Sequence, residues 1–166
     1  MPPGYGLEAA EPAPLDWPVE RARLATARSY WIGTTTPGGR PHAMPVWGVV
    51  EGDRVCFGTD RGSRKARNLA ACPAVVVHLP SGDDTLIVEG TAGEVTDPTR
   101  LRVLDDAYRT KYGLGFFENP GDVVVYAVTP RVAFGWQERD FVRTATRWRF
   151  APSSPEAETG VGEESP

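Results

Sequence analysis

The sequence predicts a mainly β protein of the α+β class, an antiparallel barrel or sandwich with three short helices. About seven β-rich runs follow one another along the chain, and several are joined by short turns that contain glycine. Only three segments have helical spacing, so strands and helices do not alternate as parallel β-α-β units require. With 166 residues, 40% of them hydrophobic, the chain can form one domain around a core.

Three strands near the N-terminus are expected to form a meander. They cover residues 30–36, 40–50 and 54–59, and turns at Pro37-Gly38-Gly39 and Glu51-Gly52-Asp53 join them. Such short connections pair neighbouring strands in antiparallel fashion. The later strands are predicted at residues 74–79, 85–96, 122–128, 131–136 and 145–150.

Each predicted helix begins at a residue that suits a helix start. Asp16 opens a helix that ends near residue 28, and Ser63 begins a short helix that Pro73 stops. Asp97 opens the third and longest helix, which Gly113 caps. The apolar face of this helix is formed by Leu101, Leu104, Tyr108 and Tyr112.

The two ends of the chain differ in composition from its middle. Residues 1–15 are rich in proline, glycine, alanine and glutamate, and residues 151–166 lack apolar periodicity, so we expect a flexible N-terminal segment and a disordered acidic tail. The folded domain is predicted to span residues 16–150. Four of the 22 acidic residues lie in the tail, and the others balance the 18 basic residues.

Charge and composition exclude several classes of function. A balanced domain lacks the positive potential that a general nucleic-acid surface needs. No apolar run is long enough for a membrane helix and no secretory signal is present, so a cytoplasmic protein is predicted. Cys56 and Cys72 form no Cys-x-x-Cys motif and are expected to be free thiols.

Familiar catalytic and metal-binding motifs are missing from the sequence. His42 and His78 are the only histidines, and their spacing relative to the cysteines fits no zinc site, so no metal is predicted. The sequence has no Gly-x-Ser-x-Gly elbow, no Gly-x-Gly-x-x-Gly fingerprint and no Walker A loop.

Residues 57–66 are the most informative segment. They read Phe-Gly-Thr-Asp-Arg-Gly-Ser-Arg-Lys-Ala, which predicts a strand end, a turn and a helix that starts at Ser63. A helix N-terminus carries unpaired N–H groups and partial positive charge, so Arg64 and Lys65 in the first turn oppose the helix dipole. An anion bound between these groups removes the conflict, and the pattern therefore predicts a phosphate site.

A solvated basic helix face is the alternative interpretation of this segment. Its members are Arg61, Arg64, Lys65 and Arg67. The charge pattern alone favours neither interpretation. RNA binding is not favoured, because no aromatic residues accompany the cluster to stack on bases.

The same segment resembles the strand–turn–helix signature of the pyridoxamine 5′-phosphate oxidase-like flavoproteins. The likeness is carried by residues 57–59 and 62–66, and residues 73–77 and 88–92 are similar to the next strands of that family. Upstream, residues 39–47 are similar to the strand that carries the isoalloxazine ring in the flavin and deazaflavin oxidoreductase branch. The resemblance covers roughly residues 20–150 and implies a split β-barrel of antiparallel strands.

The resemblance also implies a cofactor, a partner and an activity. The cofactor would be FMN, or alternatively the deazaflavin coenzyme F-420, and a homodimer would hold each cofactor at the subunit interface. The phosphate would be held by Thr59, Ser63, Arg64 and Lys65. The ring would lie beside Met44, Pro45, Val46 and Trp47. His42 is a further candidate, because it belongs to the same strand.

Three departures separate the chain from true pyridoxamine-phosphate oxidases. Their Arg-x-Val-Leu-Leu-Lys strand has no counterpart at residues 43–48, Thr85 replaces a glutamine that contacts the ring, and their Arg-x-Glu-Phe-Trp substrate motif is missing. The predicted function is therefore a flavin- or deazaflavin-dependent oxidoreductase with another small-molecule substrate, without a predicted catalytic residue. The alternative is a non-catalytic split-barrel protein that binds FMN or haem.

Overall fold

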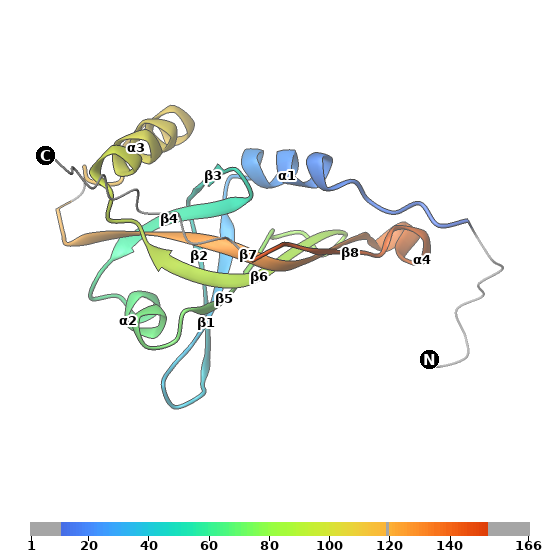
Figure 1. The fold of residues 1–166 in the computed structure, drawn as a ribbon, viewed down its shortest axis with the longest axis horizontal. Helices are drawn as coiled ribbons and strands as arrows, with labels where there is room; N and C mark the ends of the chain where they lie inside the picture. The colour runs from blue at the N-terminus through green and yellow to red at the C-terminus, as the bar shows by residue number, and fades with distance from the viewer. Residues whose placement is uncertain (1–10, 119, 153–166) are drawn as a thin grey trace, which may run out of the picture.

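A computed structural model describes residues 11–118 and 120–152 of the chain. Its strands are β1 (Tyr30–Thr35), β2 (Pro41–Val46), β3 (Val49–Glu51), β4 (Arg54–Asp60), β5 (Ala74–His78), β6 (Asp84–Glu94), β7 (Val123–Gln137) and β8 (Thr146–Arg149). They form one antiparallel sheet in the order β2-β1-β5-β6-β7-β4-β3, with β8 paired to β7. The sheet curls into a half-barrel (Figure 1), which confirms the predicted split β-barrel.

Helices pack on both sides of the curled sheet. The described residues form α1 (Trp17–Thr26), α2 (Arg64–Ala71), α3 (Pro98–Tyr112) and α4 (Phe141–Thr144). Figure 1 shows α1 and α3 above the sheet and α2 below it, near the β1–β2 hairpin. The first three confirm the predicted helices. The prediction of three helices misses α4, whose four residues are too few to show helical spacing. None of the described helices is long and apolar enough to cross a membrane.

Two predicted strand boundaries are wrong. Residues 40–50 form two strands rather than one, because the chain leaves the sheet at Trp47 and Gly48. The strands β2 and β3 lie at opposite ends of the strand order, so the predicted three-strand meander is also wrong. The strands predicted at residues 122–128 and 131–136 form the single strand β7, which runs through Pro130. A shift of register beside Gly90 in β6 accommodates this proline within the sheet.

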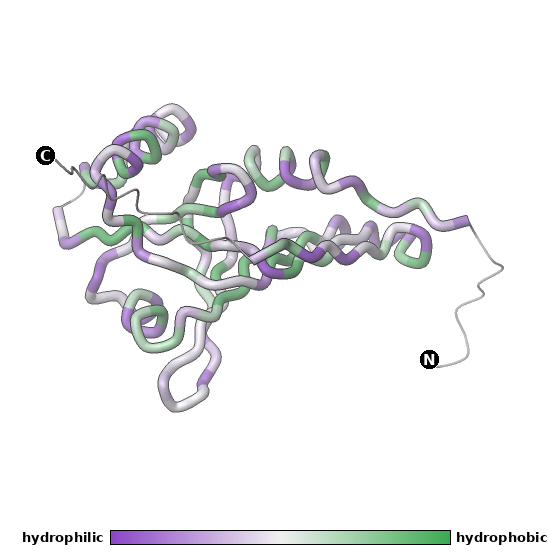
Figure 2. Tube along the Cα trace, in the orientation of Figure 1, coloured by the Kyte–Doolittle hydropathy of each residue, from purple (hydrophilic) through white to green (hydrophobic). Residues whose placement is uncertain are grey.

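The interior contains two hydrophobic clusters, one on each side of β7. The larger lies inside the half-barrel, and the smaller lies between the sheet and α3. Val124, Tyr126 and Val128 belong to the first cluster, while Val125 and Ala127 belong to the second. This part of β7 is therefore apolar on both faces. Figure 2 shows the hydrophobic residues of the strands gathered in the middle of the molecule.

Residues 11–15 belong to the segment predicted to be flexible, and the structure places them beside α4 and β8. The N–H group of Ala13 donates to the carbonyl of Arg143 (3.0 Å), and that of Leu15 donates to Oγ1 of Thr146 (2.8 Å). The rest of that segment, and the predicted acidic tail from residue 153 onward, lie outside the described residues.

Candidate functional site

Local hydrogen bonds fix the turn between β4 and α2. Oδ1 of Asp60 accepts from the N–H group of Gly62 (2.7 Å), and the Asp60 carbonyl accepts from that of Ser63 (2.9 Å). Oγ of Ser63 accepts from the N–H group of Ala66 (3.2 Å) and so caps α2. Oγ1 of Thr59 lies 3.0 Å from the same Ser63 oxygen. The turn thus brings the predicted residues Thr59 and Ser63 together at the start of α2.

Arg64 and Lys65 begin α2 without a counter-charge. Within the described residues neither makes an ion pair or a hydrogen bond, and the first turn of α2 contains no acidic residue. Arg64 is exposed, whereas Lys65 is half-buried, and this burial lowers the pKa of Lys65. Arg61 differs, because its guanidinium pairs with Glu94 (2.8 Å) and Asp122 (3.2 Å). The unfavourable pair of cations expected from the sequence is therefore not neutralised by the described residues.

Lys65 lines a cavity of about 360 Å³. Pro45 and Val46, at the end of β2, and Trp47, which follows β2, also line this cavity. All three belong to the strand predicted to lie beside the flavin ring. The other lining residues are Ser29, Gly58 and Tyr108. One cavity therefore combines a cation with an apolar and aromatic wall, an arrangement that suits an anionic group joined to a flat ring.

Side chains of α3 hold the break between β2 and β3. The N–H group of Gly48 donates to the hydroxyl of Tyr112 (3.0 Å), and the Gly48 carbonyl accepts from Nζ of Lys111 (2.9 Å). The Tyr112 hydroxyl also lies 2.9 Å from the carbonyls of Gly48 and Arg28, to either of which it can donate its single proton. The Tyr112 ring stacks on Trp47 with 4.8 Å between ring centroids. The end of α3 therefore fixes Trp47 at the cavity.

The same break tolerates only glycine at position 48. A Cβ atom on Gly48 would lie 2.7 Å from the carbonyl oxygen of Cys56. Lys111, which bonds the Gly48 carbonyl, also donates to the carbonyl of Ala25 (3.1 Å) and the hydroxyl of Tyr30 (2.9 Å). Burial lowers the pKa of Lys111, but three oxygen acceptors surround its ammonium group and favour the charged form.

Sequence reasoning did not identify Ser29, Gly58 and Tyr108 as site residues. Gly58 lies where the ring of Phe116 packs, since a Cβ atom there would be 2.6 Å from the Phe116 ring. Tyr108 was expected only on the apolar face of its helix. A tyrosine on the apolar face of a helix shows that a hydroxyl group is present on that face. It does not show that a cavity lies beside it.

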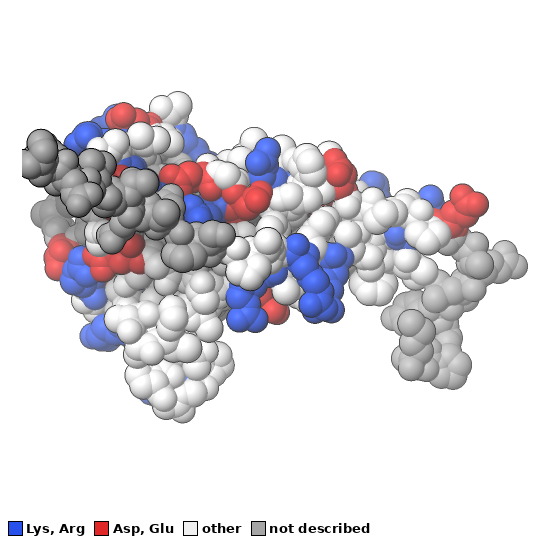
Figure 3. Space-filling view, viewed as in Figure 1, with Lys and Arg blue, Asp and Glu red and all other residues white. Residues whose placement is uncertain are grey.

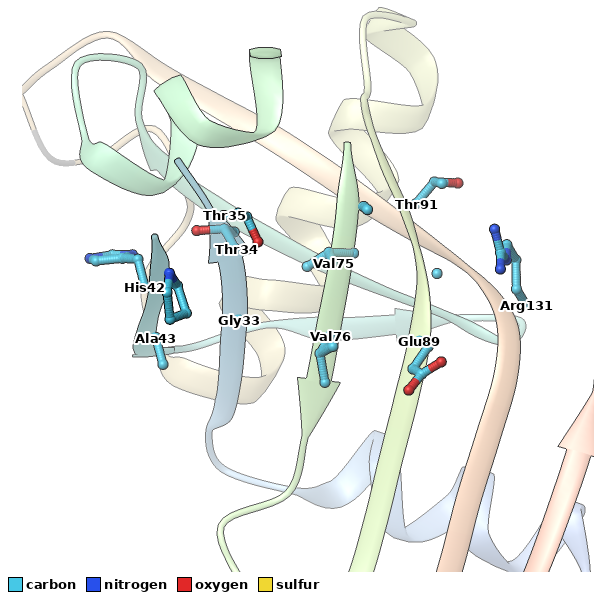
Figure 4. Close-up of a pocket in the computed structure, with 13 residues that line it drawn as sticks. Gly33, Thr34, Thr35, His42, Ala43, Val75, Val76, Glu89, Thr91 and Arg131 are labelled. Atoms are coloured by element: carbon cyan, nitrogen blue, oxygen red, sulfur yellow. The ribbon is translucent and has the colours of Figure 1, made fainter. Parts of the chain in front are cut away.

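His42 and Met44 do not line the Lys65 cavity. His42 instead borders a hollow of about 630 Å³ that extends over β2, β1, β5, β6 and β7. Figure 4 shows His42 at the β2 end of this hollow, Val76 in the middle, and Glu89 and Arg131 at the other end. Nδ1 of His42 is buried and has no hydrogen-bond partner in the described part of the chain. Met44 has 45% of its surface exposed.

The chain resembles known proteins in sequence and in fold. The family model described as pyridoxamine 5′-phosphate oxidase matches residues 18–137. No curated protein sequence matches the chain.

Several solved structures have a similar fold. A conserved hypothetical protein from Mycobacterium tuberculosis has 22% identity and a TM-score of 0.66, over 75% of this chain and 86% of that one. A heme-binding protein from Mycobacterium smegmatis has 16% identity and a TM-score of 0.66, over 78% of this chain but 55% of that one. An F-420 reductase has 27% identity and a TM-score of 0.54, over 67% of this chain and 93% of that one.

Proposed function

Because the chain belongs to the pyridoxamine 5′-phosphate oxidase-like family, we propose that it binds FMN in the Lys65 cavity and acts as an oxidoreductase on a small molecule. The observation that carries the proposal is the meeting of Lys65 with Pro45, Val46 and Trp47 in one cavity. The deazaflavin coenzyme F-420 is the alternative cofactor, and the likeness to an F-420 reductase supports it.

The cavity and the start of α2 together fit a phosphorylated flavin, although Lys65 alone of the four predicted phosphate residues lines the cavity. Arg64 and Lys65 are cations without partners in the described protein, and the start of α2 adds unpaired N–H groups, so these groups would hold the phosphate. The hydroxyls of Thr59 and Ser63 lie at the same helix start. Trp47, with the neighbouring residues of β2, would form the wall for the ring.

The protein's own contribution to the reaction would be binding and orientation. A bound flavin supplies the redox chemistry, so no side chain has to act as a catalytic acid or base. The turn before α2 would orient the phosphate, and the fixed Trp47 would orient the ring. Pyridoxamine phosphate is not the proposed substrate, because the strand and C-terminal motifs of the true oxidases are absent from the sequence.

We further propose a homodimer in which a second copy closes the site. The chain leaves Met44, Trp47 and Val76 exposed to 45%, 38% and 37%, on or beside the strands that border the cavity and the hollow. Few charged side chains cover the protruding β1–β2 hairpin end in Figure 3. Exposed apolar groups of this kind are typical of protein interfaces.

Native mass spectrometry of the purified protein tests both proposals together, because it reports subunit number and cofactor mass. We expect a dimer that carries one FMN per chain after incubation with FMN. A protein that stays monomeric in the presence of FMN would contradict the shared site. A dimer that retains neither FMN nor coenzyme F-420 would contradict the cofactor assignment.

The affinity for FMN is expected to fall as the pH rises into the alkaline range. Burial already lowers the pKa of Lys65 in the free protein, so its ammonium group loses its proton at lower pH than that of an ordinary lysine. A bound phosphate favours the charged form of Lys65. The contribution of Lys65 to FMN affinity is therefore fully present below the pKa of Lys65 in the free protein, and it declines as the pH rises through that pKa.

The pH effect is measured by flavin fluorescence titration between about pH 7 and pH 9.5. The matched control is Lys65→Arg, because a guanidinium stays charged over this range. We expect the Kd of the wild type to rise with pH while that of the variant changes less. Parallel curves for the two proteins would show that Lys65 does not hold the phosphate.

A non-catalytic split barrel that binds FMN or haem is the second candidate. The likeness to a heme-binding protein favours it. A histidine that ligates a metal almost always donates its other ring N–H to a protein group. Nδ1 of His42 has no such partner in the described residues, and this favours flavin over haem as the cofactor. A Soret band that forms on adding haem to the wild type, and not to His42→Ala, would support the haem alternative.

A further inference from the structure

We propose that Tyr108 contacts the ring of the bound flavin directly and donates a hydrogen bond to it from its hydroxyl. Tyr108 lies in α3 and lines the same cavity as Lys65 and Trp47. The inference rests on the proposed function and deepens it, because it assigns a polar contact to the ring half of the site.

The Tyr108 hydroxyl has no partner within the described protein. The residue is only 9% exposed, yet no described group forms a hydrogen bond with its hydroxyl. The other described tyrosines all use theirs: Tyr30 donates to the carbonyl of Leu24 (2.6 Å), Tyr126 to that of Ala66 (3.4 Å), and Tyr112 bonds the Gly48 peptide. The hydroxyl is not among the buried atoms of the described residues that lack a partner, so it remains accessible and can bond a ligand in the cavity that Tyr108 lines.

The structure holds the Tyr108 ring firmly in place. Its centroid lies 4.0 Å from that of Phe116 and 4.7 Å from that of Tyr112. The backbone N–H group of Phe116 donates to Oδ1 of Asp105 (2.6 Å), which ties the segment after α3 back to the helix. Tyr112 is bonded to the Gly48 peptide next to Trp47. The hydroxyl therefore has a fixed position relative to the aromatic wall of the cavity.

The chemistry of the hydroxyl suits a permanent donor. Burial raises the pKa of Tyr108 to about 12, so the group stays protonated at physiological pH. The edge of a flavin ring presents carbonyl oxygens and ring nitrogens that accept hydrogen bonds, whereas the phosphate is assigned to Arg64 and Lys65. A donor at the ring stabilises the electron-rich reduced form more than the oxidised form, and so raises the reduction potential.

The test is Tyr108→Phe, which removes the hydroxyl and keeps the ring packing. Titrations with FMN and with riboflavin, which lacks the phosphate, are expected to show a rise in Kd of about 3- to 10-fold for both ligands. The midpoint potential of the bound FMN should fall. The ligand-free variant should unfold at no lower temperature than the wild type, because no protein hydrogen bond is lost.

Tyr112→Phe is the matched control on the same helix. Its hydroxyl serves the backbone of Gly48 and Arg28, so its loss should lower the unfolding temperature of the ligand-free protein.

Three outcomes would overturn the inference. Unchanged affinity of Tyr108→Phe for both ligands would exclude the contact, and a loss for FMN alone would assign the hydroxyl to the phosphate. A ligand-free Tyr108→Phe protein as destabilised as Tyr112→Phe would show a structural role instead. A wild type that binds neither ligand nor coenzyme F-420 would contradict the proposed function itself.

Discussion

Replacing Arg64 and Lys65 together with alanine is expected to weaken FMN binding by about 2–5 kcal/mol, a rise in Kd of roughly 30- to 4,000-fold. The two side chains would supply charge-assisted contacts to a phosphate at the start of α2. Neither has a partner in the described protein, so the fold should not depend on them. Flavin fluorescence titration measures the Kd, and thermal unfolding verifies that the variant is folded.

The control for this variant removes two exposed arginines elsewhere, with Arg21→Ala in α1 and Arg102→Ala in α3. It makes the net charge more negative by the same amount, so any nonspecific electrostatic effect appears in both proteins. Riboflavin adds a second control, because its affinity should be nearly the same for the wild type and the Arg64/Lys65 variant. An FMN affinity equal to that of the wild type would remove the phosphate assignment.

Gly90→Ala is expected to destabilise the fold by about 3 kcal/mol or more. A Cβ atom at this position would lie 2.1 Å from the carbonyl oxygen of Thr129, which is backbone and has no freedom to rotate away. The clash falls at the irregular register where β6 passes Pro130 of β7, the strand pair that forms the centre of the sheet. For a domain of this size the loss corresponds to a fall in Tm of about 6–12 °C.

Gly93→Ala is the matched control in the same strand, because a Cβ atom there meets nothing within 4 Å. Urea unfolding of both variants gives the free energies of unfolding. We expect Gly93→Ala to stay within about 1 kcal/mol of the wild type. Equal free energies of unfolding for the two variants would mean that β6 and β7 do not approach each other closely at Gly90.

The overall fold was predictable because its signals are local. Glycine turns such as the one at Gly52 join neighbouring strands, and the caps of the third helix, Asp97 and Gly113, are read from a few adjacent residues. The structure confirms both caps, since Asp97 accepts from two N–H groups and Gly113 has φ of 82°. The four-residue helix α4 is too short to give such a signal.

The errors in the predicted strands come from long-range contacts. The chain breaks at Gly48 because side chains of α3, more than 60 residues later, satisfy its peptide groups. The strand β7 continues through Pro130 because Gly90 on the neighbouring strand leaves room for it. Neither partner is near in sequence, so no local pattern predicts either feature.

The candidate site was predictable only in part for the same reason. The start of α2 is a local motif, and the prediction of Ser63, Arg64 and Lys65 as phosphate-binding residues comes from it. That Lys65 shares a cavity with Trp47 depends on how β4, α2 and β2 fold together. Tyr108 is indistinguishable in sequence from a core residue, and only the hydrogen bonds of the other tyrosines set it apart.

A crystal structure of the protein grown with FMN tests the central claim most directly. We expect the phosphate at the first turn of α2, bonded to Ser63, Arg64 and Lys65, with the flavin ring against Trp47. A structure with FMN bound elsewhere, or with both cations pointing into solvent beside an empty helix start, would contradict the account.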